Sequence, residues 1–165
     1  MTLLTTARAK LRRFTQTDLG PLTEMMTNPR VMQYTGFKTP QPIEKIQESL
    51  SKWMNPADPQ LGVWASTLLD TNEVFGWFML MPTIEGESPE LGFMLNEKFW
   101  NKGLASEIAI ALLDYGFIQL HLKRIIARAN PENLPSISIL KKLGMSPFKN
   151  QRESSDIIFF ESLRD

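Results

Sequence analysis

Two kinds of hydrophobic periodicity alternate along the chain. Short apolar or alternating stretches bounded by turn residues predict strands over 11–14, 62–69, 74–81, 90–95 and 124–129, with one or two more near 148 and over 157–162. Apolar residues at three- and four-residue spacing predict helices over 19–26, 42–53, 103–117 and 136–143. The chain therefore mixes both element types from end to end.

The order of these elements predicts the fold class. The strand, helix and strand between residues 90 and 129 imply two neighbouring parallel strands joined by a right-handed crossover. The two stretches around the predicted turn at 70–72 imply an antiparallel hairpin. We expect an α/β fold with a mixed, mostly antiparallel twisted sheet flanked by helices. With no repeat or linker, residues 1–165 are predicted to form a single domain.

Composition excludes several function classes. Lys plus Arg equals Asp plus Glu, 18 against 18, so no net field draws the protein to nucleic acid. The chain has no cysteine, which excludes disulfides, thiol nucleophiles and cysteine metal sites. Its one histidine, His121, is read as a charge near a helix end. We expect no metal, no nucleic-acid partner, and a monomer or homodimer.

The sequence has no apolar run long enough to span a bilayer, and its beginning lacks a signal-peptide core. We therefore expect no membrane partner and a cytoplasmic location.

The segment after the strand at 90–95 predicts an anion site. A polar turn over 96–102 leads through Gly103 into a helix, whose first N–H groups have no internal partner and favour negative charge. Small residues at Gly103 and Ala105 let the backbone approach phosphate oxygens. One glycine near a helix start is common, so a simple turn glycine is the alternative interpretation.

Two motifs make the interpretation specific. Residues 99–107 read Phe-Trp-Asn-Lys-Gly-Leu-Ala-Ser-Glu, and some thirty residues later Asn133 and Ser136 precede a Leu-Gly-Met ending at 143–145. In this order and separation they resemble the GNAT superfamily of acetyl-CoA-dependent N-acetyltransferases. The likeness is strongest to the branch containing the ribosomal-protein N-terminal (alanine or serine) acetyltransferases. It covers residues 90–146, with a weaker match at 8–18.

The resemblance implies acetyl-CoA as co-substrate. In this family the two parallel strands splay apart, and the pantetheine arm lies in the cleft, paired with the first strand. Asn101 stands where the family often has glycine, and asparagine tolerates a left-handed backbone. The indole of Trp100 is expected to pack under the loop. The residues implied in acetyl-CoA binding are Phe93, Leu95, Trp100, Asn101, Lys102, Gly103, Leu104, Ala105, Ser106 and Asn133.

Three residues are candidates for catalysis. The backbone N–H of Leu95 matches the position that faces the thioester carbonyl and could hold the oxyanion. Leu140 stands where other members have a proton-donating tyrosine, which leaves Ser136 as the candidate acid, or as a small packing residue. Glu90 is the candidate base, with a solvated strand end as the alternative.

Two further residues have structural alternatives. Asn133 is expected to bind the pantetheine arm, or else only to cap a helix. Glu107, in the first turn of the predicted helix, is interpreted as a structural residue stabilised by the helix dipole.

The predicted function is an N-acetyltransferase that moves an acetyl group to a primary amine by direct attack in a ternary complex. The acceptor could be a ribosomal-protein N-terminus, another protein N-terminus or a small-molecule amine. The alternative is an acyl-CoA-binding module that senses or interacts with little or no turnover. A general nucleotide-triphosphate protein is disfavoured, because the chain has no Gly-Lys-Ser/Thr phosphate loop.

Overall fold

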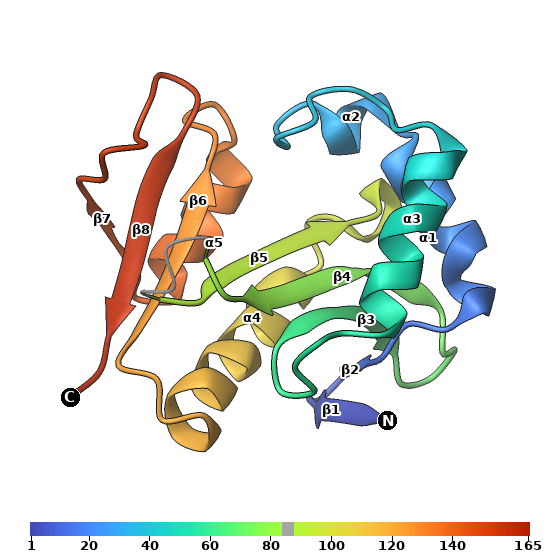
Figure 1. Cartoon of the computed structure of the whole chain (residues 1–165), viewed down its shortest axis with the longest axis horizontal. Helices are drawn as coiled ribbons and strands as arrows, with labels where there is room; N and C mark the ends of the chain where they lie inside the picture. The colour runs from blue at the N-terminus through green and yellow to red at the C-terminus, as the bar shows by residue number, and fades with distance from the viewer. Residues whose placement is uncertain (84–87) are drawn as a thin grey trace.

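A computed structural model describes residues 1–83 and 88–165. Its strands form one eight-stranded sheet in the order β1-β2-β3-β4-β5-β6-β8-β7 (Figure 1). Only β5 and β6 pair in parallel among the described strands, so the predicted mixed, mostly antiparallel α/β fold is confirmed. The strands are β1 Thr2–Thr5, β2 Ala9–Arg12, β3 Gly62–Leu68, β4 Val74–Met81, β5 Glu90–Leu95, β6 Arg124–Ala129, β7 Ser146–Phe148 and β8 Ile158–Leu163.

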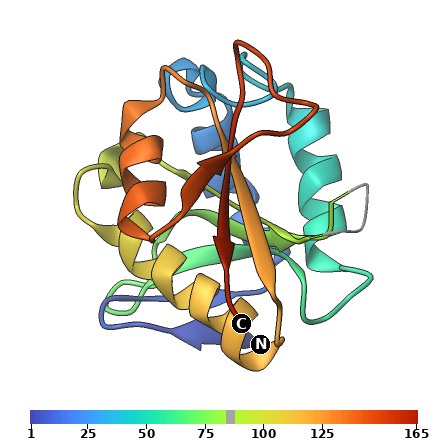
Figure 2. The same ribbon diagram turned by 90° about the vertical axis from the view of Figure 1, so that its left-hand side faces the viewer.

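Helices cover both faces of the sheet. One face carries α1 and α3, and the other carries α4 and α5, as Figure 2 shows with the sheet between them. The helices are α1 Leu19–Met26, α2 Pro29–Met32, α3 Ile43–Met54, α4 Leu104–Asp114 and α5 Leu134–Lys142. Within the described residues, none of them has the length and apolar character needed to cross a bilayer.

The central strand β5 contributes to the core on both of its faces. Leu91 and Leu95 pack into the cluster that contains α4, and Met94 packs into the cluster that contains α1 and α3. Side chains along a strand alternate between the two faces. Glu90 and Gly92 therefore lie on the same face as Met94, opposite α4 and α5.

Several predicted boundaries are wrong by a few residues for local reasons. The first predicted strand, 11–14, lies at Ala9–Arg12 and follows β1, which the sequence did not predict. The helix predicted from residue 136 begins at Leu134, because Asn133 caps it and Pro135 is tolerated in a first turn. The helix predicted to reach 117 ends at Asp114, where a π-helical turn over Tyr115–Gln119 replaces it.

A buried ion pair fixes the start of the α1 region to the sheet. Asp18 is 3% exposed and binds Arg12 through two bonds of 2.8 and 2.9 Å, and it accepts a third from the Thr15 N–H at 2.8 Å. Burial acts to raise the pKa of Asp18, but the bonds from Arg12 and Thr15 outweigh it and hold the pKa below its ordinary value.

We expect Asp18→Asn to lower the free energy of unfolding by about 2–4 kcal/mol, because it leaves Arg12 without its counter-charge. The contribution of Asp18 is present above the unfolded pKa of about 3.9, and it is lost as pH falls through the lower folded pKa. Urea unfolding at several pH values measures both effects. The exposed pair of Lys38 and Asp156 provides the control, since Asp156→Asn should cost at most about 1 kcal/mol.

Candidate active site

The site is built where β5 and β6 separate. Among the described residues, Glu90 and Ile126 are the only two that pair between these strands. Beside them the Ile126 N–H donates a hydrogen bond of 3.0 Å to the Pro89 carbonyl. Beyond this pair the two strands diverge (Figure 1), whereas β4 stays paired with β5 over all six of its residues. From Gly92 onward, the edge of β5 that faces β6 therefore has no partner strand.

The hydrogen-bond alternation of β5 identifies which backbone groups face that edge. Just after β5, the Asn96 N–H donates to the carbonyl of Phe75 on β4 at 2.8 Å. In an antiparallel pair every second residue bonds the partner, so Gly92 and Met94 direct their N–H groups to β4. The N–H groups of Phe93 and Leu95 then point toward β6, at the free edge. The sequence suggests these backbone groups for pantetheine pairing and for an oxyanion donor, and those roles stay predictions.

The loop between β5 and α4 adopts a conformation suited to phosphate. Asn101 and Gly103 both have left-handed backbones, with φ of 59° and 75°. Gly103 caps α4, and the N–H groups of the first turn, Leu104–Ser106, have no partner within the helix. Residues 101–103 are exposed and Ser106 is partly exposed, whereas Leu104 and Ala105 are buried. As the sequence suggested, Asn101 adopts a left-handed backbone at the position where the family often has glycine.

Trp100 connects this loop to the end of β5. Its indole N–H donates to the Leu95 carbonyl at 3.0 Å, and its ring packs against both hydrophobic clusters. Arg30, which is ion-paired with Glu97, lies 5.8 Å from the ring centroid. The indole thus holds the loop against the sheet, and no reactive role follows from its contacts.

Glu107 anchors the same loop to the N-terminal hairpin. It accepts bonds from the Thr6 hydroxyl at 2.6 Å, the Arg8 N–H at 2.9 Å and the Arg8 Nε at 2.7 Å. Burial acts to raise the pKa of Glu107, but the bonds from Thr6 and Arg8 outweigh it and lower the pKa. These contacts agree with the structural role expected for Glu107.

Arg8 brings a positive charge to the loop, which sequence reasoning did not assign. Its Nη1 donates to the Lys102 carbonyl at 2.8 Å, and its Nη2 lies 3.4 Å from the position that a Cβ on Gly103 would take. A guanidinium held there by Glu107 favours an anion on the loop. The available signal was the weak family match at residues 8–18, which includes Arg8 itself.

The start of α5 contributes the second motif. Asn133 caps the helix, since its Oδ1 accepts the Ser136 N–H at 3.3 Å. Its amide nitrogen donates to no group in residues 1–83 or 88–165, so it remains available to a ligand. Leu140 is 1% exposed and belongs to the core. Because β5 and β6 are parallel, both α4 and α5 begin near the carboxyl ends of these strands.

We expect Asn133→Ala to raise the KM for acetyl-CoA and also to lower the free energy of unfolding by about 1 kcal/mol through loss of the cap. Asn133→Ser keeps a cap acceptor but removes the amide donor, so it should raise the KM while preserving stability. Steady-state kinetics and thermal unfolding of both variants check this. A variant that loses only stability would make Asn133 a cap and nothing more.

Glu90 lies on the opposite face, at the point of separation. Its side chain is 15% exposed, and its Oε1 accepts a bond of 2.8 Å from Arg128 Nε on β6. Arg128 is 46% exposed. Glu90 is therefore a paired and largely buried carboxylate beside the free edge of β5. His121, in contrast, follows the π-helical turn at the far end of α4 from Gly103 and takes no part in this arrangement.

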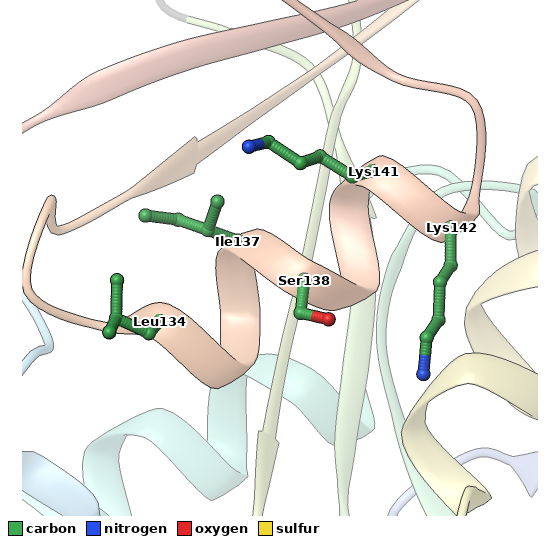
Figure 3. A pocket seen from close by; sticks show the side chains of 5 residues that line it. All are labelled: Leu134, Ile137, Ser138, Lys141 and Lys142. Atoms are coloured by element: carbon green, nitrogen blue, oxygen red, sulfur yellow. The ribbon is translucent and has the colours of Figure 1, made fainter.

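A separate hollow of about 500 Å³ runs along the outside of α5. Figure 3 shows its lining: Leu134, Ile137, Ser138, Lys141 and Lys142, with the two lysines extending in different directions. All five residues come from one helix, and none is a predicted site residue. The hollow is open surface, so the site is defined by the separated strands instead.

Comparison with known proteins identifies the family. The model of the acetyltransferase (GNAT) domain matches residues 8–146. The chain belongs to the GNAT family. It is 30% identical over 142 residues to the Bacillus subtilis protein named uncharacterized N-acetyltransferase YnaD, covering 86% of this chain and 81% of YnaD. It is therefore an N-acetyltransferase that depends on acetyl-CoA.

Solved structures of this GNAT fold superimpose over nearly the whole chain. An acetyltransferase of the GNAT family from Bacillus anthracis has a TM-score of 0.84 at 28% identity, covering 99% of this chain and 98% of its own. RimL, a ribosomal L7/L12 α-N-protein acetyltransferase in complex with coenzyme A, has a TM-score of 0.79 at 14% identity, with the same coverage. At that identity the likeness to RimL shows the fold alone.

The residues of this GNAT chain fit acetyl-CoA. The exposed left-handed loop and first turn of α4 offer N–H donors to phosphates, and Arg8 adds positive charge. The free edge of β5 offers backbone groups to the amides of a pantetheine arm. The amide nitrogen of Asn133 is one more available donor near the carboxyl ends of the two strands.

Proposed function

We propose that this protein transfers the acetyl group of acetyl-CoA directly to a primary amine while both substrates are bound. The observation that carries the proposal is the placement of two sets of groups on opposite faces along the separated strand β5, with Glu90 at its beginning and the carrier donors toward its end. The donors for the carrier lie on the side of α4 and α5, and the Glu90 carboxylate lies on the side of α1 and α3. Two substrates can then meet where β5 and β6 separate.

Each site residue has a place in this reaction. Amines with a pKa of about 8 to 10 are mostly protonated at neutral pH, and Glu90 takes that proton directly or through water. The neutral nitrogen attacks the thioester carbonyl, so a C–N bond forms while the C–S bond breaks. The Leu95 N–H donates to the oxygen that becomes negative. Ser136 donates its hydroxyl proton to the departing sulfur and takes up the second proton that the attached nitrogen loses, so the hydroxyl is restored.

The proposal needs no covalent enzyme intermediate, which agrees with a chain that has no cysteine. Positioning of the two substrates is expected to supply much of the rate. The acceptor is a primary amine of a protein N-terminus, as the resemblance to the ribosomal-protein branch suggests, or of a small molecule. RimL by its name acts on a ribosomal protein N-terminus, but substrates vary widely on one fold.

Thiol release from acetyl-CoA, with mass detection of acetylated product, tests the proposal across peptides, amino acids and polyamines. Direct transfer requires intersecting lines in double-reciprocal plots against both substrates, whereas parallel lines would indicate a covalent intermediate and contradict it. An acyl-CoA-binding module without turnover would instead show a rise in melting temperature with coenzyme A and no product from any amine.

A further inference from the structure

The ion pair of Glu90 and Arg128 uses only part of its hydrogen-bonding capacity. One bond joins Arg128 Nε to Glu90 Oε1. A guanidinium has five N–H donors and a carboxylate has two acceptor oxygens. In the described residues the Nη groups of Arg128 and the Oε2 of Glu90 have no other partner. The pair therefore presents one unused acceptor and a set of unused donors side by side.

This unused capacity faces the acceptor side of the sheet. Successive side chains of β6 point to opposite faces of the sheet. One set packs in the cluster that contains residues of α4 and α5, namely Ile125, Ala127 and Ala129. The other set consists of Arg124, Ile126 and Arg128. Arg128 therefore shares with Glu90 the face opposite those helices. It is also the more exposed partner, at 46% against 15%, so an incoming molecule reaches the guanidinium as well as the carboxylate.

On the side of β4, the surface next to the pair is apolar. On β4, Met81 lies opposite Glu90 and Met79 lies opposite Gly92, with Trp77 two residues further along the same face. Gly92 has no side chain, and the Met79 methyl lies 2.7 Å from where its Cβ would be, so Met79 covers this part of β5. Methionine side chains adapt to varied apolar partners. No carboxylate occurs in this row of β4 that could bind a second ammonium group.

We propose that the acceptor is a free α-amino acid with an apolar side chain. Its amino group binds Glu90 Oε2, its carboxylate binds the Nη groups of Arg128, and its side chain lies on Met79 and Met81. The two unused groups of the ion pair are adjacent, as the amino and carboxylate groups of an α-amino acid are. This inference rests on the proposed function, and it names the acceptor class of the same site.

Three classes of amine would interact differently with the pair of Glu90 and Arg128. A peptide N-terminus has an amide where the amino acid has a carboxylate, so Arg128 gains no charged partner from it. A polyamine places further cations near Arg128, which repels them. Only the amino acid neutralises both members of the pair, through charge-assisted bonds that are stronger than neutral ones.

The test compares leucine with leucinamide and with spermidine by mass-detected acetylation. The amide has the less basic amino group, so unassisted deprotonation favours leucinamide, and a preference for leucine must come from recognition. We expect kcat/KM for leucine to exceed that for leucinamide by about tenfold to hundredfold, as for one charge-assisted contact. Equal use of the two, or preferred use of spermidine, would overturn the inference and leave acetyl transfer itself standing.

Variants assign the preference to the guanidinium. Arg128→Gln should reduce the ratio of kcat/KM for leucine to kcat/KM for leucinamide toward one, while leucinamide is still acetylated. Arg128→Lys should restore part of the preference for leucine. Arg124→Gln is the matched control, because Arg124 forms the same kind of cross-strand pair with Glu161 at 2.6 Å and should leave the ratio unchanged. If Arg128→Gln lowers kcat/KM equally for leucine and leucinamide, Arg128 only positions Glu90, and the inference is overturned. Failure of every amine, with coenzyme A still bound, would contradict the proposed function instead.

Discussion

Gly103→Asp should abolish the binding of coenzyme A while the protein still folds. The left-handed residue 103 begins α4 beside N–H donors that have no partner within the helix, and an aspartate there places a side chain and a negative charge in the way of the phosphates. The fold survives because, among the described residues and apart from its chain neighbours and the backbone of its own helix, the only heavy atom that a Cβ would meet within 4 Å is Arg8 Nη2, at 3.4 Å. Aspartate also tolerates a left-handed backbone better than most residues.

The measurement is the melting temperature with and without coenzyme A. At a ligand concentration 100 times Kd, binding stabilises the native state by about 2.7 kcal/mol. For a chain of this size that corresponds to a rise of roughly 5 to 11 °C, which the variant should lose.

Gly144→Asp is the matched control, because Gly144 also has a positive φ, of 80°, and apart from its chain neighbours no heavy atom of the described residues lies within 4 Å of an added Cβ. It should lower stability in a similar way but keep the ligand response. A folded Gly103→Asp variant with the full response would refute the assignment of the phosphate loop.

The sequence predicts most of this architecture because its signals are local. The strands at 74–81, 90–95 and 124–129 have the predicted bounds, since each apolar stretch ends at turn or cap residues. The loop could also be predicted, because its requirements concern the backbone of a few consecutive residues. Asn101 and Gly103 are two residues that accept left-handed angles, and both adopt them.

The features that the sequence did not predict depend on contacts between distant segments. β1 is four residues long and exists through pairing with β2, so its own pattern is too short to identify it. Arg8 reaches the loop across 94 residues to the Lys102 carbonyl. The partner of Glu90 is Arg128, 38 residues away, because parallel pairing brings β6 beside β5. Nothing in the hydrophobic pattern of either strand indicates which charged side chains meet.

Glu90→Gln should reduce turnover by about tenfold to a thousandfold at neutral pH, which is the scale of a general-base contribution. Glutamine keeps the shape of the side chain and can still bond Arg128 through its amide oxygen, but it cannot accept the proton of the amine. The loss should shrink as the pH rises toward the pKa of the acceptor amine, because the neutral amine then forms without help. The pH profiles of kcat and kcat/KM for the two proteins measure this.

Glu161→Gln supplies the control for Glu90→Gln. Glu161 pairs with Arg124 on the same face of β6, is 23% exposed, and lies on β8, away from the free edge of β5. A general effect of breaking such a pair would slow both variants and would not depend on pH in this way. If Glu90→Gln alone is slow at neutral pH and recovers at high pH, the proton path runs through Glu90. Wild-type turnover across the whole range would make Glu90 a binding partner of Arg128, and water or a backbone carbonyl would then take the proton.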